Sequence, residues 1–314
     1  MAYSWRKTGI LKLIIMKQKK RKSGFLSSKI NPKGFHISQW KFYAFLLPMS
    51  MFMILPIVFI FNHAFKPVEE LFFWPPRFFV RRPTLRSFEN LISLTTDTHI
   101  PVSRYLFNTF VVTVIAILIT LVISVAAGYA LSKKDFRVKN ILFQINTLAL
   151  MFVPIAVTVP RYMIIVNLGL IDSFAVNILP LVVSPVSVFL IKQFVDTNVP
   201  DSLVEAARID GASDLYILWK VVLPLVTPAL ATVTIMVFQS SWAYTEASVM
   251  FINNESYRTF AYFITTFVTT GGGMHVATAG VAAASTLIMF IPNLIIFIFM
   301  QSRIINTMAH SGIK

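Results

Sequence analysis

The sequence predicts an all-α, polytopic membrane protein with six transmembrane helices. Hydrophobic residues make up 56% of the 314 residues and charged residues only 13%, which is far from the composition of a soluble domain. Six apolar stretches each reach about twenty residues or more, the length that an α-helix needs to cross the hydrocarbon core. The 28 Lys and Arg residues gather beside these stretches, as expected for loops that meet anionic lipids.

The charge bears on the partners of the chain, and the absence of cysteine bears on its disulfides and metal sites. A net charge of +15 would suggest a nucleic-acid partner in a soluble protein. Here the basic residues flank apolar stretches, so we expect membrane lipids as partners and no nucleic acid. The chain has no cysteine, which excludes disulfides and Cys-ligated metals, and its scattered histidines predict no metal site.

Three regions follow from the composition along the chain. Residues 1–41 hold eleven Lys and Arg and no acid, and we expect a basic cytoplasmic tail. Residues 42–302 form the six-span domain, and residues 303–314 a second cytoplasmic tail. The predicted spans are 42–61, 106–131, 141–166, 174–194, 223–244 and 276–300.

Prolines and small residues mark features inside these spans. The first, third and fourth spans each contain two prolines, at 48 and 56, 154 and 160, and 180 and 185. A span tolerates such prolines when its neighbours satisfy the freed carbonyl groups. In the second span, Ser124, Ala126, Ala127 and Gly128 form a run of small residues. We expect another helix to pack closely there.

The basic residues also predict the orientation of the chain. With the N-terminus inside, the cytoplasmic segments hold 20 of the 28 Lys and Arg residues. Positive charge favours the cytoplasmic side of a membrane. Both termini should therefore lie in the cytoplasm, together with the polar stretch 196–222 between the fourth and fifth spans.

That polar stretch predicts a helix, a break and a second helix. Pro200 suits a first helical position, and Asp201 places negative charge in the opening turn. Gly211 follows as a left-handed stop, and Ser213 caps the next helix. On this pattern alone, the stretch is either an ordinary cytoplasmic loop or a helix that another protein binds in a groove.

The spacing of this stretch resembles a known motif. Glu205-Ala206-Ala207, then Gly211, Val221 and Leu223-Pro224 match the EAA motif of bacterial ABC importer permeases, in the version found in the carbohydrate-importer group similar to the maltose permeases. The resemblance covers most of the chain from about Asn108 onward. It implies a type I ABC importer fold and a subunit of an ATP-driven importer in the bacterial cytoplasmic membrane, with a sugar, and specifically an oligosaccharide, as the expected substrate.

The resemblance also implies partners and site residues. The partners would be a second homologous permease subunit, a dimer of ABC ATPases, and an extracellular sugar-binding protein. The residues that couple to the ATPase would be Glu205, Ala206, Ala207, Asp210, Gly211, Leu223 and Pro224. The chain has no GxxxxGK[ST] phosphate loop, so we expect no enzyme activity and no cofactor in this chain, with ATP and Mg²⁺ bound by the partner ATPases.

Polar residues inside spans are expensive to bury in lipid and often mark a substrate path. The candidates here are Gln144, Asn146, Asn177, Gln239, Ser240, Trp242, Tyr244 and Glu246. Amide groups could bond sugar hydroxyls and aromatic rings could stack on the sugar. The other interpretation of these residues is hydrogen bonding between helices. For the whole chain, an ABC permease for amino acids or peptides and a stand-alone secondary transporter remain as alternatives.

Overall fold

The computed structural model describes residues 40–75, 77–93, 100–269 and 276–311, and no β-strand occurs among them. The prediction of an all-α protein is confirmed. The predicted N-terminal tail lies outside the described residues except for positions 40 and 41. The longer helices are α2 (Trp40–Ala64), α4 (Arg86–Ser93), α5 (Val102–Lys133), α6 (Lys139–Ala149), α7 (Thr158–Asn167), α9 (Pro185–Asn198), α10 (Asp201–Ile209), α13 (Thr227–Trp242), α15 (Phe260–Thr269) and α16 (Val276–Ser311).

Short elements connect these helices. They are α3 (Val68–Leu71), α8 (Leu179–Val182), α11 (Asp214–Tyr216), α12 (Leu223–Leu225) and α14 (Glu246–Met250), the 3₁₀ turns Pro154–Val157, Phe174–Asn177 and Glu255–Tyr257, and the π-helix Ile217–Val222. The chain divides into two units after Val58. In the first unit the structure describes only residues 40–58 of α2, whose side chains are almost all exposed and largely apolar.

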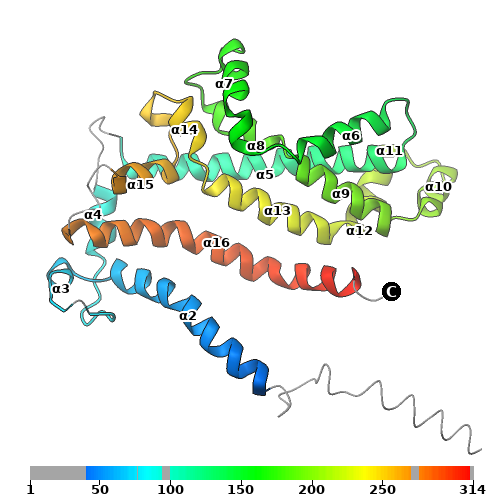
Figure 1. Ribbon diagram of the computed structural model, residues 1–314. Coiled ribbons are helices and arrows are strands. Elements are labelled where there is room, and N and C mark those ends of the chain that lie inside the picture. Colours follow the sequence, from blue (N-terminus) through cyan, green and yellow to red (C-terminus); the bar gives the residue numbers. More distant parts are fainter. Residues whose placement is uncertain (1–39, 76, 94–99, 270–275, 312–314) are drawn as a thin grey trace, which may run out of the picture. The chain divides into compact units, whose positions relative to one another are not determined.

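The second unit is built around α5, the long helix at its centre (Figure 1). α9 and α13 pack along α5, and α16 packs against α13. The contact with α9 is close at Gly128, where an added β-carbon would lie 2.7 Å from Ile191 Cγ2. Gly128 and Ser124 are buried while Ala126 is exposed. Only part of the predicted run of small residues therefore lies in the packing face.

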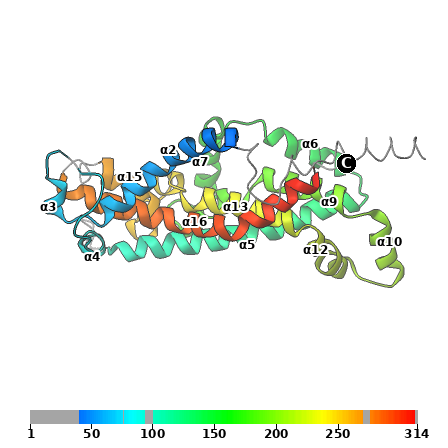
Figure 2. The same ribbon diagram turned by 90° about the horizontal axis from the view of Figure 1, so that it is seen from below.

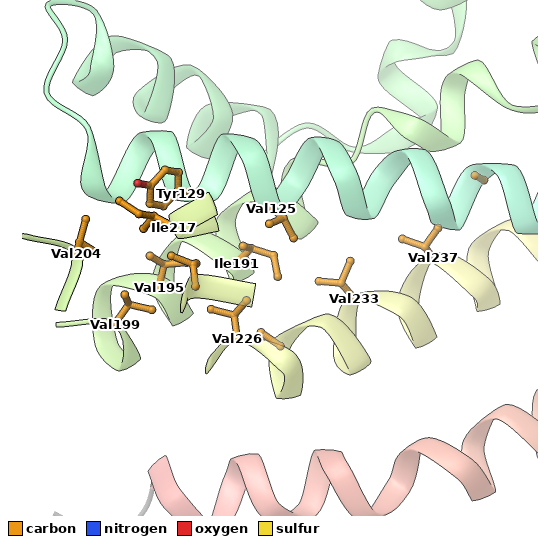
Figure 3. Packing of buried hydrophobic residues seen from close by; sticks show 13 residues of the cluster. Val125, Tyr129, Ile191, Val195, Val199, Val204, Ile217, Val226, Val233 and Val237 are labelled. Carbon is orange, nitrogen blue, oxygen red and sulfur yellow. The ribbon is translucent and has the colours of Figure 1, made fainter. Parts of the chain in front are cut away.

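A cluster of buried valines and isoleucines joins α5, α9 and α13 to the segment after α10 (Figure 3). Val125 and Tyr129 come from α5, Ile191 and Val195 from α9, and Val233 from α13. Branched side chains on three helices interdigitate here, and the burial of each contributes about 1.5–3 kcal/mol. The cluster continues to Val204 in α10 and Ile217 in the π-helix, so the polar stretch of the sequence rests on the core.

Within the described part of the chain, four stretches are long and apolar enough to cross a membrane: α2, α5, residues 174–198, and residues 279–301 of α16. Two further apolar stretches are bent. α6 and residues 154–167 meet at 110°, and residues 214–225 and 227–250 meet at 82°. The predicted number of six spans is reached when each bent pair counts as one span.

The third predicted span, 141–166, is therefore not one continuous helix. Proline restricts the residue before it to extended backbone, and Val153 has φ −72° and ψ 130° ahead of Pro154. The chain turns sharply at this position. Pro160 causes no break because it lies in the first turn of α7, where a missing N–H is tolerated.

The fifth and sixth spans also differ from the prediction in their boundaries. The straight part of the fifth span begins at Thr227 rather than at residue 223, with Pro228 in its first turn, where proline is favoured. α16 continues to Ser311, beyond the predicted end of the sixth span at residue 300. Residues 303–311 of the predicted C-terminal tail are therefore helical.

Candidate functional site

α10 and the turn after it project beyond one end of α5 (Figures 1 and 2). Pro200 precedes the helix as its cap instead of taking the first helical position. α10 ends at Ile209, Asp210 is the C-terminal cap, and Gly211 has φ +80°. The predicted left-handed stop is confirmed. A β-carbon on Gly211 would meet nothing within 4 Å, so the backbone conformation is what favours glycine here.

A second helical segment starts directly after this turn. Ser213 Oγ accepts a hydrogen bond of 3.3 Å from the backbone N–H of Tyr216, which confirms the predicted cap. The next six residues, Ile217–Val222, form a π-helix, a rare geometry that often accompanies function. The sequence did not predict it. Leu223 and Pro224 then lead through α12 to α13.

Ion pairs fasten this element to the end of α5. Lys133 Nζ lies 2.6 Å from Asp201 Oδ1, and the Lys133 side chain is only 6% exposed. Lys134 pairs with Asp214, which also lies 3.9 Å from Arg208. The hydrogen bond from Lys133 holds the pKa of the Asp201 carboxyl below its ordinary value, so this carboxyl is ionised at neutral pH.

The outer surface of the element is both apolar and acidic. Leu203, Glu205, Ala206 and Asp210 are exposed, and Ile209 is 86% exposed. Beyond the turn, Leu215, Tyr216 and Trp219 are exposed as well. We call these eight residues the α10 face. Ala207 was expected on the same surface but is half-buried against the core, because it lies one position past Ala206 around the helix.

Glu205 and Asp210 are the two acidic residues of this face, and both have a free charge. Among the described residues no hydrogen bond or ion pair to either carboxylate occurs. Asp201 and Asp214, by contrast, are held by lysines of α5. Of the four acids in residues 200–222, two therefore fix the element, and Glu205 and Asp210 remain available to a partner.

The candidate substrate-path residues do not form one cluster. Gln144, Gln239 and Ser240 are exposed on their helices. Asn146 donates to the Pro185 carbonyl at 3.1 Å, and the buried Asn177 donates to the Tyr257 carbonyl at 2.9 Å. Each of these two asparagines therefore forms a hydrogen bond to another segment of the chain. Such hydrogen bonding was the alternative to substrate contact.

Trp242 is part of the packing between helices. Its side chain is 7% exposed, and its indole N–H donates to the Met289 carbonyl of α16 at 3.0 Å. It also stacks on Phe238, with 5.4 Å between ring centroids. A sugar could not reach this ring in the described arrangement, so the structure favours the interhelical alternative for Trp242.

Glu246 and Tyr244 are brought together with Arg161, which is distant in sequence. Arg161 Nη1 lies 3.0 Å from each carboxylate oxygen of Glu246. This ion pair joins α7 to α14, and both side chains are about a third exposed. The Tyr244 hydroxyl is buried next to this ion pair, beside the Arg161 side chain.

The comparison with protein families decides the identity of the chain. The family described as "Binding-protein-dependent transport system inner membrane component" matches residues 121–303, more than half of the sequence. The chain belongs to this family. It is thus a permease, and the alternative of a stand-alone secondary transporter is set aside.

Two relatives and one solved structure illustrate the similarity. The permease is 28% identical to the arabinooligosaccharides transport system permease protein AraQ of Bacillus subtilis, over 86% of this chain and 94% of that one. It is 29% identical to the polygalacturonan/rhamnogalacturonan transport system permease protein YtcP of the same organism, over 68% and 72%. Its fold matches a bacterial ABC transporter involved in the import of the acidic polysaccharide alginate, with a TM-score of 0.72 and 24% identity over 86% of this chain and 98% of that one.

The permease also contains a polar loop whose ordering hydrogen bonds the sequence did not reveal. Asp172 Oδ1 accepts hydrogen bonds from the backbone N–H groups of Asn253 and Asn254, at 3.0 and 2.7 Å. Tyr105 donates to Glu255 at 2.9 Å, and Asn108 donates to the carbonyls of Ser256 and Arg258 at 2.8 and 2.9 Å. The loop 251–259 is thereby fixed to α5 and to the turn before α8. The only local signal was Asn254-Glu255-Ser256, since Asn side chains commonly accept from the backbone two residues ahead.

Proposed function

We propose that this permease is one of two homologous membrane subunits of an ATP-driven importer for an oligosaccharide. The relatives described above are permeases for arabinooligosaccharides and for galacturonan-type polymers. What these compounds share is a chain of several sugar residues. The sugar that this permease carries is accordingly an oligosaccharide, delivered by an extracellular sugar-binding protein.

The observation that carries this proposal is the exposed α10 face, on a helical element that ion pairs hold to the end of α5. A dimer of separate ATPase subunits, which bind ATP and Mg²⁺, would dock on this face. Ile209 offers apolar surface at its centre, and Glu205 offers a charge that no residue of the described chain neutralises. A basic residue of the ATPase would pair with Glu205.

The contacts of α10 indicate how movement would pass into the membrane. When the ATPases close, they displace α10. Asp201 and Asp214 transmit this displacement through Lys133 and Lys134 to the end of α5. α5 in turn packs along α9 and α13, so the three helices shift together. Access to the substrate would then alternate between the two sides of the membrane.

The positions of the basic residues give the orientation within this proposal. α10 and both termini lie on the cytoplasmic side of the bacterial cytoplasmic membrane, where ATP is available. The loop 251–259 and the opposite end of α5 face the sugar-binding protein. Translocation requires no covalent chemistry from the permease itself, and ATP hydrolysis takes place in the partner subunits.

Reconstituted transport tests this proposal. The complete importer, purified through this subunit and placed in liposomes, is offered labelled arabinotriose and digalacturonate as a neutral and an acidic probe. We expect ATP-dependent uptake of at least one of them, and loss of that uptake in Glu205→Lys. Glu89→Lys, an exposed acid on α4, is the matched control and should transport normally. Uptake without ATP, uptake of neither sugar, or equal uptake by the two variants would contradict the proposal.

A further inference from the structure

The loop between α2 and α4 presents an aromatic and basic surface that the import mechanism does not use. We call its described residues, 65–75 and 77–85, the Trp74 loop. Phe72, Phe73 and Phe79 are exposed, and Trp74 is 90% exposed. Four exposed aromatic side chains within one loop need an explanation.

The loop is a built structure that holds these rings outward. The buried Lys66 donates from Nζ to the Arg77 carbonyl. The two carboxylate oxygens of Glu70 accept from the backbone N–H groups of Arg81 and Arg82, at 3.1 and 3.0 Å. The Thr84 N–H bonds to the Phe65 carbonyl at 2.9 Å and closes the loop. The inward polar groups are thus paired with the backbone, and the aromatic side chains remain outside.

The arginines of the loop are left without acidic partners. Glu70 is occupied by backbone N–H groups. In the described part of the chain, Arg77, Arg81 and Arg82 form no ion pair. The Arg77 guanidinium lies 5.2 Å from the centroid of the Phe73 ring. Arginine beside an aromatic ring is a combination that suits a phosphate next to apolar material.

Packing fixes the loop at the level where the membrane-spanning helices end. α3 packs against the first turns of α16, at the end of α5 opposite to α10 (Figures 1 and 2). A β-carbon on Gly280 would lie 3.4 Å from Leu71 Cδ1. The apolar stretch of α16 begins at Ala279, and α2 ends at Ala64, directly before the loop. The loop that carries the aromatic rings is therefore next to the end of one membrane-crossing stretch and the start of another.

We infer that the Trp74 loop is an interfacial anchor, which inserts its aromatic rings among the headgroups of anionic phospholipids. Trp and other aromatic residues favour this depth, where apolar and wet surroundings meet. Arg81 and Arg82 bind the lipid phosphates, whose charge complements theirs. The position beside the span ends favours lipid over a soluble protein partner. The inference requires only that the chain spans a membrane, so it does not depend on the substrate or on the ATPase.

Fluorescence quenching tests the anchor on the full-length chain, which contains no native cysteine. Trp74→Cys is labelled with an environment-sensitive fluorophore and reconstituted in vesicles of phosphatidylcholine and phosphatidylglycerol. We expect quenching by lipids that carry a spin label near the headgroup, and protection from iodide in the water. Glu69→Cys, at an exposed acid of the same loop, is the control and should show the reverse.

The role of the arginines is tested in the same vesicles. The spin label is placed either on phosphatidylglycerol or on phosphatidylcholine. Quenching of the Trp74→Cys label should be stronger from phosphatidylglycerol, and this preference should be lost in R81Q/R82Q. The native Arg81 and Arg82 side chains form no hydrogen bond in the described chain, so their replacement removes none. A label that iodide quenches as strongly as in Glu69→Cys overturns the inference. So does a label shielded from both quenchers, because protein then covers the loop.

Discussion

At Gly211, a single backbone angle sets the direction of the chain after α10. The φ of +80° lies in the left-handed region, which disfavours a residue with a β-carbon by about 1–2 kcal/mol. Free space around the residue rules out a steric clash as the reason for glycine. A substitution would act by rotating the chain between Ile209 and Tyr216, and so by splitting the α10 face.

Comparison of two substitutions at Gly211 separates conformation from size. Asparagine tolerates the left-handed region better than other residues, whereas a β-branched valine does not. We expect Gly211→Val to lose most transport and Gly211→Asn, of similar bulk, to keep most of it. The measurement is uptake in liposomes at equal amounts of membrane-inserted protein. Equal loss in both variants would show that the left-handed turn is not what the position requires.

At the scale of elements, the sequence correctly predicted the features that depend on residues close together in the chain. The stop at Gly211 and the cap at Ser213 follow from residues a few positions apart. The pairs Lys133–Asp201 and Arg161–Glu246 join residues 68 and 85 positions apart, and no periodicity predicts such contacts. The 110° bend before Pro154 belongs between these cases, because proline predicts a break but not its angle.

The ion pair Lys133–Asp201 joins α5 to α10. Reversal of its charges tests whether it transmits movement between the two helices. We expect Lys133→Asp to uncouple ATP hydrolysis from uptake, because α10 then moves without pulling α5. Adding Asp201→Lys restores the opposite charges and should recover part of the coupling. The readout is the ratio of sugar imported to ATP hydrolysed in liposomes. If both variants keep the normal ratio, force passes to α5 by another route.

Across the whole molecule, two ends of one helix bundle have different surroundings. At one end of α5, Lys133 and Lys134 hold α10 and the segment after it in place by ion pairs. The α10 face is exposed there and can bind a protein partner. At the other end, the Trp74 loop is closed by its own hydrogen bonds, and the loop 251–259 is held by Asp172 and by side chains of α5. The buried cluster between α5, α9 and α13 extends from α10 along these helices, so a displacement of α10 would pass to all three of them.

The central claim, that a nucleotide-hydrolysing subunit docks on the α10 face, is tested most directly by photo-crosslinking in native membranes. A photoreactive amino acid replaces Ile209 of the α10 face, or Phe107, which is also exposed but lies toward the opposite end of α5. Mass spectrometry identifies the crosslinked protein. We predict an ATPase subunit crosslinked through position 209 and none through position 107. Crosslinks from position 209 to lipid alone, or to proteins that bind no nucleotide, would contradict the account.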